Sequence, residues 1–496
     1  MTRYELYSTG SNSHGQLGLA SEQDHSVYTR IALPPNCKPL QLALGANHSL
    51  LVAEVDARKI LLGSGSNQAG QLGRGDETLR LSFEEIRWDQ FVPDDLADES
   101  EDDYTIEGVA SSWGTSFIHL RPSGSEEEDE ETRIGETRSD ILVSCGSNDW
   151  GERGVGEGRR PNPTVVSFAH IVNGPYRISR LVAGPRHILA LLEPLPSKAI
   201  STPAPILVGW GASRHGQLGS SDSASKLPRI TSIPQNVPLP SPFSANDIID
   251  FSCGKDHSAV LLHPHTIASP AEPSLLVLGS NKHGQLGPIN SSSSSSAPRS
   301  NLLPLSQLTK SISDSPSSLS STTVHTTWNS TFLTLPSSLP PYDSTATPLS
   351  TSSIIAFGSN PHGQLGQGGT IALDSINVTP TDLRILDFHS VSLARSSHPS
   401  FSPMSTSLRL CVGSEHLLAL FDSSTSQQLY TWGWNEHGNL GLGEGDLLDR
   451  REPVRVQGIE RILREQGGRI EGIWAGMATS WVAISYEEEK DETGDE

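Results

Sequence analysis

The sequence predicts an all-β fold, a seven-bladed β-propeller, and two observations support that prediction. A glycine-rich nonapeptide occurs seven times, and a second pattern of strand, turn and strand alternates with it, also seven times. Each pair of patterns supplies about four strands, which is the content of one propeller blade. A chain of 496 residues could otherwise hold two or three ordinary domains, so the internal periodicity favours one repeat unit.

The nonapeptide reads G-x-N-x-H-G-Q-L-G in its most regular form, and a short run of strand-forming residues precedes it. Its glycines permit a positive φ or a close backbone approach, and its asparagine tolerates left-handed geometry. The leucine is its one large apolar residue, so we expect burial beneath the loop. The copies begin at Gly10, Gly65, Gly146, Gly211, Gly279, Gly358 and Gly433, and the leucines are Leu17, Leu72, Leu218, Leu286, Leu365 and Leu440.

The second pattern places a glycine turn between two strands, as in ALGANHSLLV around Gly45 and VAGPRHILAL around Gly184. At the chain ends this repeat is split. Only the strand at residues 5–9 precedes the first nonapeptide, and the strand at residues 480–485 ends the last repeat. We therefore expect the two ends to pair within one blade, which would close the ring and remove two sheet edges.

The propeller is predicted to occupy residues 1–486, followed by an acidic tail at residues 487–496. The spacing between nonapeptides is irregular, and the excess length lies in segments rich in serine, threonine, proline or acidic residues. Such compositions bury too little apolar surface to fold by themselves. We expect disordered loops at about 123–140, 288–323, 336–353 and 390–407.

The formal net charge is −22 and no basic run occurs, which disfavours direct binding to nucleic acid or a membrane surface. No apolar stretch approaches the roughly 18 residues of a membrane span, and the N-terminal MTRYELYSTG lacks the apolar core of a signal peptide. The four cysteines form no C-x-x-C pair, which suits a reducing compartment. We expect a soluble, cytoplasmic monomer.

The chain shows no recognisable catalytic, cofactor-binding or metal-binding pattern, because G-x-S-x-G, G-x-x-x-x-G-K-[ST] and H-E-x-x-H are all missing. Nine histidines share two repeat positions, but equivalent positions on neighbouring blades are too far apart to hold one ion. We expect structural hydrogen bonds from them and a non-enzymatic protein without cofactors. They are His14, His215, His283, His362 and His437 in the nonapeptide, and His48, His187, His257 and His416 in the second pattern.

Positions at which one repeat departs from the others are the candidates for partner contacts, because repeated residues build the architecture. Exposed Trp and Arg often anchor protein interfaces, although packing between blades is the alternative role for each Trp. The primary candidates lie in the last nonapeptide, and secondary ones lie in the second pattern and the third nonapeptide. They are Trp434, Asn435, Glu436 and His437, then Trp113, Trp150 and Arg153.

The alternation of G-x-N-x-H-G-Q-L-G with G-x-x-H-S resembles the regulator-of-chromosome-condensation repeat family from about Tyr4 to Ser485, apart from the insertions. The resemblance implies the propeller fold. Within the family, the last-blade sequence TWGWNEHGN is similar to the alpha-tubulin suppressor group, also called killer-toxin-insensitivity proteins, and to secretion-regulating exchange factors. That similarity implies a cytoplasmic and nuclear protein that binds a small zinc-ribbon electron carrier in diphthamide synthesis and Elongator-dependent tRNA wobble-uridine modification.

A second function stays open, because the name-giving member of the family is a guanine nucleotide exchange factor for a small Ran-like GTPase on chromatin. Chromatin attachment would call for basic surface, which the negative net charge and acidic C-terminal residues disfavour. The resemblance thus implies either a non-catalytic platform for the zinc-ribbon partner or an exchange factor for a small GTPase.

Overall fold

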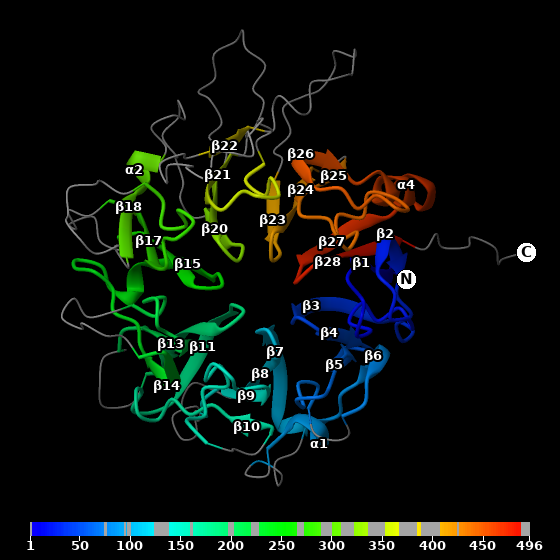
Figure 1. Ribbon diagram of the computed structural model, residues 1–496. Coiled ribbons are helices and arrows are strands. Elements are labelled where there is room, and N and C mark those ends of the chain that lie inside the picture. Colours follow the sequence, from blue (N-terminus) through cyan, green and yellow to red (C-terminus); the bar gives the residue numbers. More distant parts are fainter. Residues whose placement is uncertain are drawn as a thin grey trace, which may run out of the picture.

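Seven four-stranded sheets surround a central axis in the computed structural model, so the fold is the predicted seven-bladed β-propeller (Figure 1). We number the blades along the chain and describe each from its innermost strand outward. The structure describes residues 2–73, 77–93, 96, 101–123, 138–158, 162–196, 203–219, 228–264, 272–288, 300–308, 322–335, 353–366, 384–387, 407–423 and 426–487.

The first four blades follow one another without interruption. Blade 1 contains β3 (Lys38–Leu44), β4 (His48–Val55), β5 (Arg58–Gly65) and β6 (Arg80–Glu85). Blade 2 contains β7 (Tyr104–Ser111), β8 (Thr115–Pro122), β9 (Ile141–Gly146) and β10 (Thr164–Val165). Blade 3 contains β11 (Tyr176–Ala183), β12 (His187–Pro194), β13 (Ile206–Ala212) and β14 (Ile230–Asn236). Blade 4 contains β15 (Ile248–Cys253), β16 (His257–Leu262), β17 (Ser274–Gly279) and β18 (Ser300–Pro304).

The last three blades complete the ring. Blade 5 contains β19 (Thr323–Thr326), β20 (Ser330–Leu335), β21 (Ser353–Gly358) and β22 (Arg384–Asp387). Blade 6 contains β23 (Ser407–Val412), β24 (His416–Asp422), β25 (Gln427–Gly433) and β26 (Arg450–Arg455). Blade 7 contains β27 (Arg469–Ala475), β28 (Thr479–Glu487), β1 (Thr2–Gly10) and β2 (His25–Arg30). The helices among the described residues are α1 (Trp88–Phe91), α2 (Leu305–Leu308) and α4 (Gln457–Gln466), with short 3-10 turns at Glu101–Asp103 and Ala245–Asp247.

Blade 7 closes the ring from both chain ends, which confirms the predicted pairing. β1 and β28 run antiparallel, with Glu5 opposite Ile484 and Thr9 opposite Ser480. β27 pairs with the other edge of β28, and β2 with the other edge of β1. The side chains of Trp481 and Ile484 on β28 are fully buried, so the closing strand is part of the core.

One end of the ring carries all seven nonapeptides, and we call it the nonapeptide face. Each nonapeptide follows the third strand of a blade, and this strand ends beside the start of the second, as His187 opposite Gly211 shows. The turns between first and second strands therefore lie on the same face, closer to the axis. The predicted leucine anchors are confirmed, since all of the following are buried: Leu17, Leu72, Leu218, Leu286, Leu365 and Leu440.

Replacing one anchor tests its contribution to stability. Leu286 is completely buried in a cluster that spans blades 4 and 5. Leu286→Ala is expected to lower the free energy of unfolding by about 2–5 kcal/mol, because the lost contacts leave a cavity in a close-packed core. Urea denaturation of both proteins measures this difference, and a change within experimental error would show that the leucine is not an anchor.

The nonapeptides also join neighbouring blades. A Cβ on Gly363 would lie 2.4 Å from Cα of Arg451, and one on Gly438 would lie 2.5 Å from Cα of Ser26. Both contacts reach the fourth strand of the next blade, and both glycines have a positive φ, so the sixth position excludes side chains for two reasons. In addition, Nε1 of Trp432 donates to the Gln364 carbonyl oxygen of the preceding nonapeptide at 2.9 Å.

The four histidines of the second pattern make the predicted structural hydrogen bonds. Each lies fully buried at the start of a second strand, and its Nε2 contacts a hydroxyl oxygen of the next blade. The pairs are His48 with Ser116 at 2.9 Å, His187 with Ser258 at 2.8 Å, His257 with Thr331 at 3.2 Å and His416 with Ser480 at 3.0 Å. These bonds tie four of the seven blade junctions.

Parts of two predicted disordered loops are ordered. Within 288–323, residues 300–304 form β18 and residues 305–308 form α2, with Leu303, Leu305 and Leu308 buried. The closely spaced leucines supply enough apolar surface to fold, a local signal obscured by the serine-rich surroundings. Within 123–140, Asp140 is buried and its carboxylate lies 2.8 Å from Nε2 of His119.

The remaining expectations about loops fall largely outside the described residues. Ser353 and Ser407 begin β21 and β23, and the rest of 336–353 and 390–407 is not covered. The same holds for residues 488–496 of the acidic tail. No helix among the described residues is long and apolar enough to cross a membrane.

Candidate functional site: an aromatic band across the nonapeptide face

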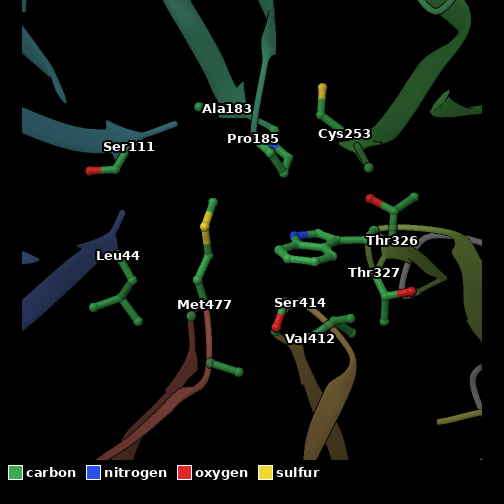
Figure 2. Close-up of a pocket in the computed structure, with 16 residues that line it drawn as sticks. Leu44, Ser111, Ala183, Pro185, Cys253, Thr326, Thr327, Val412, Ser414 and Met477 are labelled. Atoms are coloured by element: carbon green, nitrogen blue, oxygen red, sulfur yellow. The ribbon is translucent and has the colours of Figure 1, made fainter. Parts of the chain in front are cut away.

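The seven inner turns meet at the axis and surround a small cavity. Backbone hydrogen bonds connect neighbouring turns: Trp113 N–H donates to the Pro185 carbonyl at 3.1 Å, and Trp328 N–H donates to the Ser414 carbonyl at 2.9 Å. Figure 2 shows the side chain of Met477 pointing into the space between these turns. The cavity measures about 120 Å³ and is lined largely by small and apolar groups, among them Leu44, Ala183, Pro185, Val412 and Met477.

Two tryptophans from blades 2 and 5 meet at this axial opening. The ring centroids of Trp113 and Trp328 lie 5.8 Å apart, with the planes tilted by 31°. Trp113 is 46% exposed, which is unusual for so large an apolar side chain. The indole N–H of Trp328 is buried and has no hydrogen-bond partner among the described residues. Nζ of Lys255 lies 5.2 Å from the Trp328 ring centroid.

The aromatic surface continues toward the nonapeptide of blade 2. Arg186 follows Pro185 in the inner turn of blade 3, and its guanidinium carbon lies 4.5 Å from the ring centroid of Trp150. Trp150 is half-buried. This cation–π contact connects blades 2 and 3 on the nonapeptide face.

The surface also continues in the opposite direction, toward the nonapeptide of blade 6. Glu415 follows Ser414, and its carboxylate lies 3.3 Å from Nε2 of His362, while Nδ1 of His362 lies 2.8 Å from Asp449. The His362 ring centroid lies 6.1 Å from that of Trp434, which is half-buried. Burial raises the pKa of Glu415, although His362 opposes the shift.

The last member of this series joins blades 6 and 7. The ring centroids of Trp434 and His437 lie 5.3 Å apart, and Nδ1 of His437 lies 2.6 Å from the Asp24 carboxylate. We call the whole series the aromatic band. It consists of Trp150, Arg186, Trp113, Trp328, Trp434 and His437.

The structure brings four of the seven predicted contact residues into this band and places a fifth, the exposed Glu436, at its edge. The other two are buried, so neither side chain is available to a partner. Oδ1 of Asn435 accepts from Leu440 N–H at 2.8 Å and thereby holds the nonapeptide turn. Arg153 occupies the buried leucine position of its nonapeptide, where Nη2 donates to Oγ1 of Thr164 at 2.9 Å.

Sequence reasoning missed Arg186, Lys255 and Glu415 as members of this surface. They lie one or two residues after the turn glycine of the second pattern, where the seven repeats differ most. Divergence at that position is the signal that could have found them. Among the described residues, no group of three or more His, Cys, Asp or Glu side chains could hold a metal ion.

The propeller and its repeats define the class of protein that this chain resembles, the regulator of chromosome condensation (RCC1) repeat proteins. The family model matches residues 5–52, 208–261 and 427–469. The chain is 26% identical over 475 residues to the secretion-regulating guanine nucleotide exchange factor of Bos taurus, covering 93% of this chain and 80% of that protein. Its identity to the Mus musculus protein of the same name is 25% over 464 residues, covering 91% and 78%.

Solved structures agree on the fold. Human WBSCR16 superposes with a TM-score of 0.62 at 17% identity, covering 98% of this chain and 99% of that one. Prp20p from Saccharomyces cerevisiae has a TM-score of 0.62 at 16% identity, covering 98% and 92%. At these identities the likeness concerns the propeller architecture alone.

Proposed function

We propose that this protein is a non-catalytic interaction platform whose nonapeptide face binds a partner protein along the aromatic band. The observation that supports this best is the exposed ring of Trp113 at the axis, which contacts Trp328 on the same face that carries Trp150 and Trp434. Large aromatic side chains and arginine dominate the energetics of protein interfaces, since they bury much area at little entropic cost.

Removing two of the rings should weaken partner binding without unfolding the propeller. Trp113→Ala with Trp434→Ala is expected to raise the Kd for the partner at least tenfold, equivalent to about 1.4 kcal/mol. The melting temperature should fall by only a few degrees, because neither ring is fully buried. Quantitative pull-down and thermal melts of the purified proteins measure the two effects.

A matched control is Trp210→Phe, which alters a buried ring whose Nε1 donates to the Glu152 carbonyl in the preceding nonapeptide. This variant should lower the melting temperature and leave partner affinity unchanged at a temperature where it stays folded. Unaltered capture by the double Trp→Ala protein would contradict a docking role for the aromatic band.

The finer part of the proposal concerns the partner's identity. We propose a small zinc-ribbon electron carrier, and with it a role in diphthamide synthesis and Elongator-dependent tRNA modification in the cytoplasm and nucleus. The support is the resemblance of TWGWNEHGN to the alpha-tubulin suppressor group. Affinity purification from a native lysate followed by mass spectrometry tests it, and repeated purification without any zinc-ribbon protein would count against it.

Exchange activity on a small GTPase is the second candidate. It is favoured by the relatives named secretion-regulating guanine nucleotide exchange factor, and by the likeness to Prp20p, a protein that binds Gsp1p and histones. A nucleotide-release assay with a recovered GTPase separates the two functions. Accelerated release of bound nucleotide supports exchange, whereas binding without acceleration supports the platform.

A further inference from the structure

Four cations gather on one sector of the nonapeptide face, although the chain has a formal net charge of −22. Arg186 and Lys255 come from the inner turns of blades 3 and 4, and Arg214 and Lys282 occupy the fourth position of the nonapeptides of the same two blades. We call these four residues the basic sector. The two blades are neighbours in the ring (Figure 1).

Three cations of the basic sector contact aromatic or imidazole rings. Arg186 lies over Trp150, Lys255 lies over Trp328, and Nε of Arg214 donates to His215 at 2.8 Å. Burial lowers the pKa of His283, and the nearby positive charges of Lys282 and Lys255 lower it further. None of the four cations forms an ion pair with another residue in the part of the chain that the structure describes. Their charges are therefore available to a partner.

The opposite side of the same face has the reverse character. Around Trp434 the carboxylates of Glu415 and Asp449 contact His362, and that of Asp24 contacts His437. Glu436 nearby is exposed. Among the described residues of the loops that adjoin the basic sector, Asp149, Asp256 and the buried Glu152 are acidic, against four cations. The aromatic band therefore runs from a positive end to a negative end.

We propose that the basic sector binds an acidic segment of the partner protein, with apolar side chains of that segment on Trp150, Trp113 and Trp328. This inference rests on the proposed function, because it names the chemistry of the partner at the same face. Aspartate or glutamate would reach the guanidinium and ammonium groups while adjacent apolar side chains cover the rings. Such charge complementarity speeds association and sets the orientation of the bound partner.

A protein segment fits this surface better than a nucleic acid. A polyphosphate would meet the Asp149 and Asp256 carboxylates within the sector and the strong negative field of the whole chain. The cations are also too few and too dispersed among apolar rings to follow a phosphate backbone. A short acidic peptide needs only a few complementary charges and gains from aromatic contact.

The test uses the full chain and a fluorescein-labelled peptide of alternating glutamate and leucine, followed by fluorescence anisotropy. The natural protein should bind the peptide, and binding should weaken as salt rises from about 50 to about 200 mM, because the charges are solvent-accessible. Arg186→Glu with Lys255→Glu should raise the Kd at least tenfold. Arg214→Glu with Lys282→Glu alters two exposed loop residues and gives a second reading should the first variant fold poorly.

The control is Arg461→Glu with Arg464→Glu, which makes the same change in net charge on the exposed side of α4, away from the face. The inference is overturned if this control weakens binding equally, if the natural protein does not bind the peptide, or if a single-stranded oligonucleotide binds more tightly. If the natural protein fails to bind the peptide but partner capture still depends on Trp113, the basic sector does not bind an acidic segment. The proposed function would then remain supported.

Discussion

Truncation after Ile473 is expected to abolish the folded ring. The deletion removes β28, which pairs with β1 on one side and β27 on the other, together with the fully buried side chains of Trp481, Val482 and Ile484. Loss of each large core side chain costs roughly 2–5 kcal/mol, so the sum is comparable with the whole stability of a domain, about 5–15 kcal/mol. Circular dichroism of the truncated protein should show no cooperative thermal transition.

A shorter truncation provides the matched control. Ending the chain at Glu487 retains all of β28 and removes only residues 488–496. This protein should melt within a few degrees of the full chain. If the protein that ends at Ile473 also melted cooperatively at nearly the parental temperature, closure by the chain ends would not be needed for folding.

Acidification from about pH 7 to about pH 4.5 is expected to destabilise the propeller strongly, because several histidines, among them the four at the blade junctions, are buried in neutral form. Burial lowers the pKa of His48, His257 and His416 to about 4 and that of His187 to about 3. In the unfolded chain these groups titrate near pH 6.5. The unfolded state therefore binds more protons than the folded state between these values.

The sign of the effect follows from this difference. The contribution of the neutral histidines to the free energy of unfolding is fully present above about pH 6.5. It is lost as the pH decreases toward the pKa values of the folded state. Each unit of pKa difference corresponds to about 1.4 kcal/mol, so four histidines together cost on the order of 10 kcal/mol near pH 4. Thermal melts at several pH values between about 7.5 and about 4.5 measure this loss of stability.

A single-site variant assigns the decline to the histidines. His257→Gln keeps a donor for Oγ1 of Thr331 but removes one titrating group, so the slope of stability against pH should become shallower between about pH 6.5 and 5. A melting temperature of the natural protein that stays constant over this range would contradict the mechanism, as would a variant with the parental slope.

The repeat alone was sufficient to predict the blades, their leucine anchors and the pairing of chain ends, since each depends on residues close together in sequence or on symmetry. The four histidines of the second pattern that bond the next blade follow the same repeat symmetry. Wherever the second pattern has His, the next blade offers a hydroxyl, as Ser258 does for His187. Three blades lack the histidine, and for two of them the next blade has Ile188 or Leu417 at that position, whereas the third is followed by Ser49. A regular pattern therefore reports contacts between neighbouring blades as well as within them.

Departures from the repeat were harder to interpret, because a residue found in only one repeat can be either buried in the core or exposed on the surface. Trp113 proved to be exposed, whereas Arg153 extends into the buried leucine position and Asn435 holds its own turn. The α4 helix also departs from the all-β pattern. Its residue Ile459 is buried beside blade 6, and Gly467 ends it in a left-handed conformation with φ 69°.

The number of blades, their order and the strand that closes the ring were determined by the sequence alone, because local periodicity specifies strands and turns. Only the tertiary structure decided that Trp113 meets Trp328 across the axis, and that four cations of blades 3 and 4 share one sector. These contacts join residues that are distant in sequence and unrelated by the repeat. Their distances depend on the radius and closure of the whole ring, which no single repeat encodes.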